Sequence, residues 1–391
     1  MRILFLSRWF PWPTSNGSKL RIYNLLAGLA QQHEVTLLSF ADQPDANPTV
    51  PAVKSLSSAV QVVPWKPYSP QRLRAKFGFF NLAPRSVVDT FSPEMAQRIS
   101  QTLSTQQFDL VIASQIDTAR YAPYFQGLAA LFEEVEIGGL YEQFAQATST
   151  RQRLRHGLTW FKHRHYLARQ LRYFRACTVA SERERQLVAK SAPDCKVIEV
   201  IPNCIRQADY QTTCQPKPNT LVFTGPFGYH ANYDAMVWFL SEIYPIVQAA
   251  IPDVQLTITG DHGGRPLPPA TNVTLTGFVD DVRPIVAQSW ASLAPLRFGG
   301  GTRLKILEAM ALGTPVIATP KGAEGLDVQH GEQILIADTP EAYAQAIVRL
   351  CQKPGLRQQL AQKAATLVSA KYDWTATMPR FLRLVEQVTV S

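Results

Sequence analysis

The chain of 391 residues has few cysteines, and their spacing excludes two common roles. There are five, and none stands in a C-x-x-C pair (Cys177, Cys195, Cys204, Cys214 and Cys351). Paired C-x-x-C motifs are typical of zinc sites, and an even set of cysteines is typical of disulfide-linked secreted domains. We therefore expect reduced thiols in a cytoplasmic protein and no bound metal.

Long hydrophobic runs are also missing. No window approaches the stretch of about 20 apolar residues that a membrane-spanning helix needs. The N-terminal stretch MRILFLSRWF is interrupted by Arg8 and followed by Pro11 and Pro13, so it predicts a buried strand rather than a signal peptide. Charged residues make up only 18% of the chain, which argues against a long disordered tail.

Acidic residues are absent from one long segment. The net charge is +9, and residues 143–181 contain eight Lys or Arg without a single Asp or Glu. Within this segment, from Arg151 to Arg175, Trp160, Leu167, Leu171 and Phe174 recur at helical spacing. Two interpretations are open: an amphipathic helix on an anionic membrane surface, or a domain helix whose apolar stripe lies in the core. Residues 72–82 (RLRAKFGFFNL) are a second, shorter candidate of the same kind. We expect no nucleic-acid partner.

The hydrophobic pattern predicts two α/β domains with parallel sheets. Short apolar strands alternate with helical segments in each half, and a polar stretch with two prolines (QADYQTTCQPKPN) separates them. Seven strands are expected before this stretch, at residues 2–6, 35–40, 59–63, 110–113, 129–132, 177–180 and 197–201. Five are expected after it, at residues 220–224, 254–259, 273–276, 291–295 and 315–318. We predict domains at residues 1–208 and 220–371, a linker at 209–219 and a final helix at 372–391 that crosses back to the first domain.

One glycine-rich segment suggests a site for a phosphate or diphosphate. Three glycines, Gly299 to Gly301, follow a predicted strand and precede a helix. Such a turn lets a ligand approach the backbone, and the helix N-terminus offers unpaired N–H groups to an anion. Thr302, Lys305 and Glu308 are spaced to share one helix face beside the turn. The alternative is a tight turn followed by a solvated ion pair.

This segment, residues 294–325, resembles the donor-site signature of the retaining glycosyltransferases of family 4 (glycosyl transferases group 1). Four other segments resemble motifs of that family: LVFTGPFGYHANY at 221–233, TGFVDDVR at 276–283, PVIATPKGAEGL at 315–326 and VIPN at 200–203. Ser181 and Glu182 match a Ser-Glu pair of the family, and Asn16 and Gly17 match a loop whose backbone faces the donor phosphates. The resemblance implies the GT-B fold, in which two Rossmann-like domains face each other across a cleft.

The resemblance also implies site residues and a substrate. The donor is a nucleotide sugar, no cofactor or metal is expected, and Lys305 and Glu308 carry the chemistry, with Lys305 on the diphosphate and Glu308 on the ribose. The remaining donor-binding candidates are Asn16, Gly17, Gly225, Tyr229, Asn232, Phe278, Val279, Gly300, Gly301, Thr302, Arg303 and Leu304.

The sequence departs from the family pattern at several positions. Gly300 stands where the first of two glutamates is usual, and the loop from Gly225 to Asn232 lacks the Arg and Lys of many members. Cys204 and Arg206 replace the Gly and Asp that normally follow VIPN, and no histidine follows the strand at 110–113. Three functions therefore stay open. The first is retaining transfer to an acceptor, in cell-surface polysaccharide or glycolipid synthesis, by a cytoplasmic protein at the inner face of the membrane. The others are nucleotide-sugar epimerisation and a non-catalytic partner role.

Overall fold

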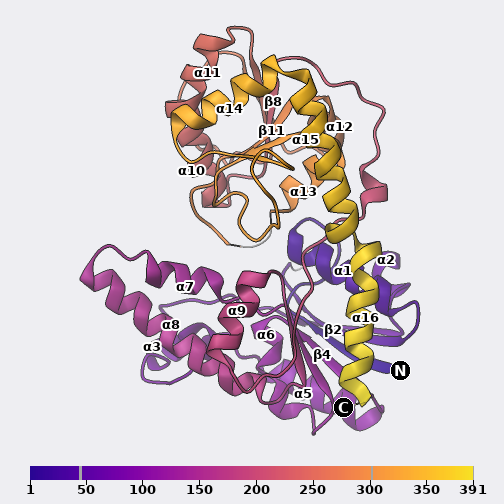
Figure 1. The fold of residues 1–391 in the computed structure, drawn as a ribbon. Helices are drawn as coiled ribbons and strands as arrows, with labels where there is room; N and C mark the ends of the chain where they lie inside the picture. Colours follow the sequence, from indigo (N-terminus) through magenta and orange to yellow (C-terminus); the bar gives the residue numbers. More distant parts are fainter. Residues whose placement is uncertain (44–45, 301–302, 391) are drawn as a thin grey trace. The chain divides into compact units, whose positions relative to one another are not determined.

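The computed structural model describes residues 1–43, 46–300 and 303–390, which form two compact units. Unit 1 comprises Met1–Asn203 and Met378–Ser391, and unit 2 comprises Cys204–Thr377. Each unit is a parallel sheet with helices on both faces (Figure 1). Among the described residues, no helix has both the length and the apolarity required to cross a bilayer.

Unit 1 is built on a seven-stranded parallel sheet with the strand order β3-β2-β1-β4-β5-β6-β7. Its strands are β1 (Arg2–Ser7), β2 (Glu34–Ala41), β3 (Ala59–Pro64), β4 (Leu110–Ser114), β5 (Ala130–Glu133), β6 (Ala176–Val179) and β7 (Ile198–Val200). Its helices are α1 (Gly17–Leu29), α2 (Pro51–Lys54), α3 (Leu73–Phe77), α4 (Arg85–Asp89), α5 (Pro93–Thr105), α6 (Ile116–Ala119), α7 (Gly138–Ala145), α8 (Thr150–Leu171) and α9 (Glu182–Ser191).

Unit 2 contains a six-stranded parallel sheet with the order β10-β9-β8-β11-β12-β13. Its strands are β8 (Thr220–Thr224), β9 (Gln255–Thr259), β10 (Val273–Gly277), β11 (Ala291–Ala294), β12 (Val316–Ala318) and β13 (Leu335–Ile336). Its helices are α10 (His230–Trp238), α11 (Tyr244–Ala250), α12 (Arg283–Gln288), α13 (Leu304–Ala311), α14 (Pro340–Gln352) and α15 (Pro354–Leu367). Helix α16 (Trp374–Val390) begins in unit 2, and from Met378 onward it belongs to unit 1.

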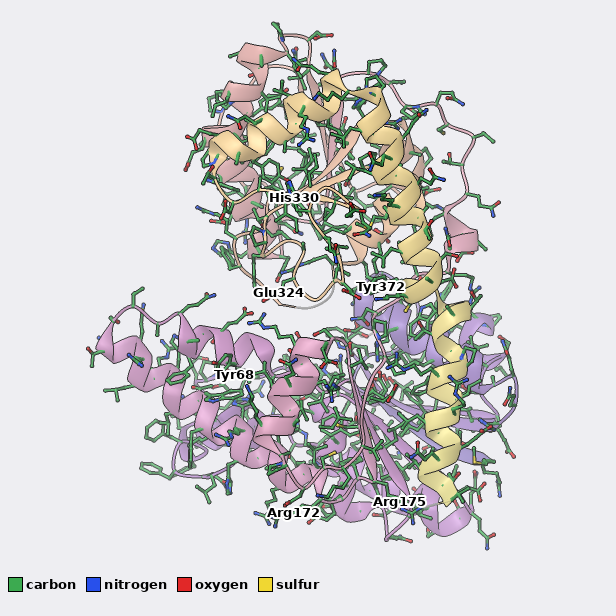
Figure 2. All side chains as sticks on the ribbon, in the orientation of Figure 1. Tyr68, Arg172, Arg175, Glu324, His330 and Tyr372 are labelled. Carbon is green, nitrogen blue, oxygen red and sulfur yellow. The ribbon has the colours of Figure 1, made fainter. Side chains whose placement is uncertain are left out.

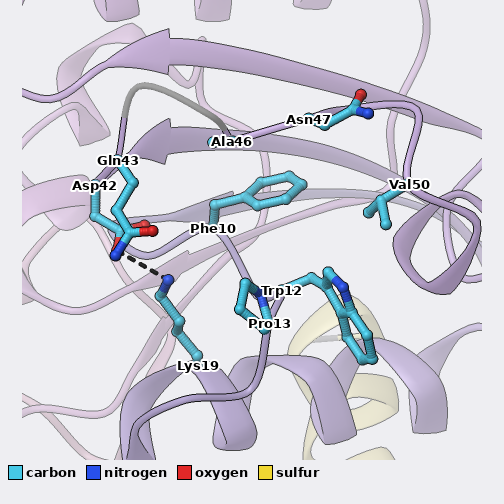
Figure 3. Close-up of a pocket in the computed structure, with 9 residues that line it drawn as sticks. All are labelled: Phe10, Trp12, Pro13, Lys19, Asp42, Gln43, Ala46, Asn47 and Val50. Carbon is cyan, nitrogen blue, oxygen red and sulfur yellow. Dashed lines mark ion pairs between the residues drawn. The ribbon is translucent and has the colours of Figure 1, made fainter.

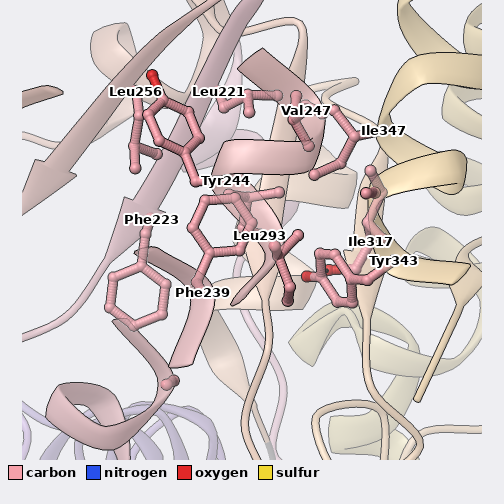
Figure 4. Packing of buried hydrophobic residues seen from close by; sticks show 14 of the residues in the cluster. Leu221, Phe223, Phe239, Tyr244, Val247, Leu256, Leu293, Ile317, Tyr343 and Ile347 are labelled. Carbon is pink, nitrogen blue, oxygen red and sulfur yellow. Dashed lines mark hydrogen bonds between the residues drawn. The ribbon is translucent and has the colours of Figure 1, made fainter. Parts of the chain in front are cut away.

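Apolar side chains from both faces of the unit 2 sheet fill its core. Phe223 from β8, Leu293 from β11 and Ile317 from β12 are each no more than 1% exposed. Figure 4 shows them with Phe239 and Tyr343 packed in one cluster. Strands covered on both faces must be apolar throughout, which is why their sequences are continuous rather than alternating.

All twelve strands predicted from the sequence are confirmed to within one or two residues. The sequence did not predict β13, because two residues are too few to show a pattern. The structure divides after Asn203, since the segment that follows is tied to unit 2. Ile205 pairs with Asp373 in a β-bridge, and the backbone N–H of Gln207 donates to the Asp373 carboxylate at 2.9 Å.

Candidate functional site

In each sheet the strand order reverses direction at one point, between β1 and β4 in unit 1 and between β8 and β11 in unit 2. Loops that leave the carboxyl ends of such strands diverge, and ligands of open α/β sheets bind there. In unit 2 the two loops are residues 225–229, after β8, and the segment after β11, of which residues 295–300 and 303 are described. The predicted donor residues fall mainly on these loops and on α10 and α13.

Lys305 of α13 reaches across to the loop after β8. Its Nζ donates to the Thr224 carbonyl and, at 3.0 Å, to Asn232 Oδ1, while the Asn232 amide donates to the Pro226 carbonyl at 2.9 Å. Gly225 has a φ of 137°, and a Cβ there would lie 2.9 Å from Lys305 Nζ and 2.6 Å from Asn232 Nδ2. The structure thus brings together three predicted residues, and only glycine leaves room for their contact.

Two side chains that the sequence also singled out, Arg303 and Tyr229, lie against the glycine turn. Arg303 is buried and donates from Nη1 to the Gly300 carbonyl at 2.8 Å and from Nη2 to the Gly299 carbonyl at 2.7 Å. Gly299 has a φ of 103°, and a Cβ on it would lie 2.1 Å from the Tyr229 hydroxyl oxygen. Arg303 therefore supports the shape of the turn, and α13 begins after it, at Leu304. Gly301 and Thr302 lie outside the described residues.

Glu308 has a partner that the sequence did not reveal. The Tyr210 hydroxyl donates to Glu308 Oε1 at 2.9 Å. Tyr210 belongs to a short 3-10 helix (Gln207–Tyr210), and Arg283 fixes this helix by donating to the Asp209 carbonyl at 2.6 Å. The only signal in the sequence was an aromatic residue within a stretch that otherwise reads as a polar linker.

Burial shifts the pKa of both charged residues on α13. The pKa of Lys305 falls to about 7, mainly because burial disfavours the ammonium and then because of the nearby Arg303 guanidinium, while Glu308 opposes the shift. Burial raises the pKa of Glu308, against the hydrogen bond from Tyr210 and the charge of Lys305. An anion placed beside Lys305 would favour its charged form.

Phe278 and Val279 follow β10 at the edge of the same sheet. Phe278 is 78% exposed. Their loop lies close to the loop after β8, because the backbone N–H of Gly260 donates to the Gly277 carbonyl at 2.8 Å, and a Cβ on Gly260 would lie 2.7 Å from the carbonyl carbon of Gly225. An exposed aromatic ring on this loop suits a planar ligand group.

Unit 1 carries a different set of groups at its switch point. Arg21 of α1 donates to Glu133 at 2.6 Å and to the backbone carbonyls of Ile201 and Pro202, which explains why the VIPN segment is held here. Gln115 donates to Glu134 at 2.8 Å. The φ angles of these two residues are 68° and 58°, a strained region for residues other than glycine, and such strain is frequent at functional sites.

Two further features of unit 1 lie at this edge. Burial is the main cause that raises the pKa of Glu134, to about 7, and the neighbouring Glu133 carboxylate adds to the shift. Asn16 caps α1 by accepting from the Lys19 backbone N–H at 3.0 Å, directly before Gly17, the first residue of that helix.

A cavity of about 210 Å³ lies beside the loop that enters α1 (Figure 3). The Lys19 ammonium pairs with the Asp42 carboxylate at 2.9 Å on one side of it, and Phe10 and Trp12 form apolar walls. Lys19 and Asp42 neutralise each other, so this cavity does not present a net charge to a ligand.

Part of the chain matches a known family. Residues 218–353 match the model of the glycosyl transferases group 1. The chain is 30% identical over 161 residues to a phosphatidyl-myo-inositol mannosyltransferase of Mycobacterium leprae, and 25% identical over 168 residues to an uncharacterised 44.6 kDa protein of the cps region of Klebsiella pneumoniae. Each alignment covers 39% of this chain. It spans 43% of the Mycobacterium leprae protein and 42% of the Klebsiella pneumoniae protein, so this chain matches less than half of either relative.

Solved structures match over the whole chain. Sucrose-phosphate synthase of Thermosynechococcus elongatus has a TM-score of 0.71 at 16% identity, with all of both chains covered. HepE of Anabaena, solved in complex with UDP and glucose, has a TM-score of 0.67 at 14% identity and covers 99% of this chain and 100% of its own. The chain therefore has the GT-B fold predicted from its sequence, and its second unit carries the segment that matches the glycosyl transferases group 1 model.

Proposed function

We propose that this protein transfers a sugar from a nucleoside-diphosphate sugar to an acceptor. The observation that carries the proposal is the cluster of Gly225, Asn232 and Lys305 beside the glycine turn, at the switch point of the unit that matches the family model. The leaving group of such a reaction is a nucleoside diphosphate, so the site must stabilise growing phosphate charge. HepE, a structural neighbour solved in complex with UDP and glucose, supports a nucleotide-sugar donor.

The residues of unit 2 divide this work among them. The Lys305 ammonium neutralises the diphosphate, and the exposed Gly300 backbone faces it from the turn. Glu308, steadied at Oε1 by Tyr210, accepts the ribose hydroxyls, and Phe278 and Val279 contact the base. With a cation already in place, transfer needs no metal. We expect activity to persist in EDTA, and magnesium-dependent recovery after chelation would contradict this.

We further propose retention of the anomeric configuration and a lipid-linked or glycolipid acceptor at the inner face of the membrane. The acceptor hydroxyl needs a partner for its proton or hydrogen bond, and the Gln115–Glu134 pair at the switch point of unit 1 offers one. The Mycobacterium leprae relative is named a phosphatidyl-myo-inositol mannosyltransferase, and this name supports a lipid acceptor.

One incubation separates this function from its two rivals. The protein is mixed with each of several nucleotide sugars, with and without a lipid extract, and products are resolved by anion-exchange chromatography. Release of nucleoside diphosphate that depends on the extract supports transfer. Conversion of the donor to its epimer without acceptor indicates an epimerase. A donor that binds but is never turned over indicates the non-catalytic partner, for which the absence of a glutamate at Gly300 is the supporting observation.

A further inference from the structure

Two basic segments that are far apart in the sequence form one surface on unit 1. Helix α3, the turn that follows it and the first half of α8 lie together (Figure 1). The Lys162 ammonium donates to the Phe79 carbonyl at 2.6 Å and lies 5.4 Å from the centre of the Phe79 ring. We call this the α3–α8 surface; it comprises residues 68–86 and 151–163.

For the apolar stripe of residues 151–175, the structure agrees with the second interpretation, a domain helix. Its predicted apolar stripe faces the core, where Leu167, Leu171 and Phe174 are buried and Trp160 packs against the same cluster. The exposed apolar residues of this surface belong to residues 151–163 of α8 and to residues 68–86, the α3 segment. They are Tyr68, Leu73, Phe77, Phe79, Phe80, Leu82, Leu154, Leu158 and Phe161.

The exposure of these side chains is large. Phe80 is 87% exposed, Phe77 and Leu154 are each 71% exposed, and Phe161 is 58% exposed. Phe79 and Leu154 line one groove, and the Phe80 ring centre lies 5.6 Å from that of Phe79. Exposed apolar side chains gathered in this way are rare on a protein that has no partner there, because they cost free energy in water. The patch therefore marks a binding surface.

Between the two segments lies a groove of about 620 Å³, within the range of pockets that hold an organic ligand. Its apolar lining comes from both sides: Tyr68, Phe79 and Pro84 from the α3 segment, and Leu154 and Leu158 from α8. Arg85, Arg155, Lys162 and His163 line the same groove. Figure 2 marks Tyr68 beside α8.

The charge of the surface selects the kind of occupant. Residues 66–88 contain five Lys or Arg and residues 143–181 contain eight, and neither stretch contains an acid. Among the described residues, Arg74, Lys76, Arg151 and Arg153 are exposed and form no ion pair with an acidic side chain. A second copy of the chain would bring like charges together. A neutral hydrocarbon would offer the Lys and Arg side chains no anionic partner.

We propose that the groove binds the hydrocarbon chain of an anionic lipid whose headgroup is held by the surrounding Lys and Arg side chains. Phe77, Phe80 and Phe161 then insert among the lipids of the membrane from which this lipid comes. Burial and the neighbouring Arg85 guanidinium lower the pKa of Lys162. An anionic headgroup beside Lys162 and Arg85 would offset the repulsion between their positive charges. This inference deepens the proposed function, on which it rests for the lipid acceptor.

The test uses the whole protein and a single-chain probe, a lysophosphatidylglycerol below its micelle concentration. Calorimetry should show one binding site, at least tenfold weaker binding of the zwitterionic lysophosphatidylcholine with the same chain, and no binding of glycerol phosphate. A Leu154→Ser/Leu158→Ser variant, at positions exposed enough to keep the fold, should bind the probe at least tenfold more weakly. A Phe80→Ser variant should bind it within twofold of wild type, because Phe80 does not line the groove.

Vesicle sedimentation provides the second readout. Wild type should pellet with phosphatidylglycerol-containing vesicles and not with pure phosphatidylcholine, and an Arg151/Arg153/Arg155→Glu variant should lose at least tenfold in partitioning. The matched control, Lys54/Arg98/Lys353→Glu, changes three exposed cations elsewhere and should stay within twofold. Binding should also weaken as salt shortens the screening length.

The outcomes distinguish this inference from the proposed function. No binding of the probe by wild type, or equal binding by the Leu154→Ser/Leu158→Ser variant, overturns the groove proposal. Preference for an RNA or an acidic peptide over the lipid overturns it as well. Nucleoside-diphosphate binding, measured on the same samples, reports on unit 2 alone. If the lipid probe binds but no nucleoside diphosphate does, the proposed transfer is wrong and the groove assignment stands.

Discussion

Each unit has its own parallel sheet with one switch point, but different kinds of residue line the two switch points. In unit 2 the edge consists of glycines around one half-buried lysine, Lys305, with Gly225 and Gly299 leaving space at positive φ. In unit 1 the same edge holds a buried network of Arg21, Glu133 and Glu134, with side chains where unit 2 has none. Under the proposed function, the glycine edge of unit 2 lets a donor diphosphate approach the backbone, and the side chains at the edge of unit 1 are available to contact the acceptor.

The largest expected effect comes from removing the charged groups of α13. Lys305→Ala and Glu308→Ala should each lower kcat/KM for the donor roughly tenfold to hundredfold, since a charge-assisted hydrogen bond contributes about 1.5–3 kcal/mol. Lys353→Ala, an exposed lysine of unit 2, is the matched control and should behave as wild type. Normal transfer by both α13 variants, with circular dichroism confirming their fold, would mean that the donor lies elsewhere.

Proton uptake should accompany donor binding, because the pKa of free Lys305 is about 7 and an adjacent diphosphate raises it. At pH 8 most of the free protein lacks this proton, so binding must take up close to one. The association constant should then fall by up to about tenfold for each pH unit above 7. Calorimetry at pH 8 in two buffers of different ionisation enthalpy measures the uptake. Zero uptake by wild type, or equal uptake by Lys305→Ala, would refute the assignment.

Tyr210→Phe should have a smaller effect. It removes the hydroxyl that holds Glu308 Oε1 and leaves the ring in place. We expect donor affinity to fall about threefold to tenfold, consistent with the loss of about 1 kcal/mol from one hydrogen bond. Affinity for a deoxyribose analogue of the nucleotide should change less, because Glu308 has fewer hydroxyls to bind there. An equal loss for both nucleotides would argue that Tyr210 acts only on the fold.

The smallest effect concerns stability and belongs to unit 1. The folded-state pKa of Glu134 is about 7, above its ordinary value of 4.5, so between these values the folded state keeps a proton that the unfolded state has lost. The free energy of unfolding therefore falls as pH rises through this window. Glu134→Gln removes the titration, so its Tm relative to wild type should be higher at pH 8 than at pH 5, by about 2 °C or more. Nucleoside-diphosphate binding should be unchanged. A constant difference in Tm would show that Glu134 titrates normally.

The same comparison explains what the sequence could predict. Apolar runs revealed every strand longer than two residues, and the glycine turn with Lys305 and Glu308 stood out because glycine spacing is visible in sequence. Tyr210 was hidden, because its contact with Glu308 joins residues 98 positions apart. The Gln115–Glu134 pair was hidden for a related reason, since backbone strain at non-glycine residues leaves no compositional mark. The α3–α8 surface needed the fold to bring two basic segments together.

The most direct test of the central claim is calorimetric titration of wild type and Lys305→Ala with UDP, GDP, ADP and CDP and with the matching nucleosides. The account predicts that at least one diphosphate binds wild type, that its nucleoside binds far more weakly, and that Lys305→Ala binds the diphosphate at least tenfold more weakly than wild type. If no diphosphate binds wild type, or if the variant binds it equally well, the Lys305 cluster of unit 2 is not the donor site.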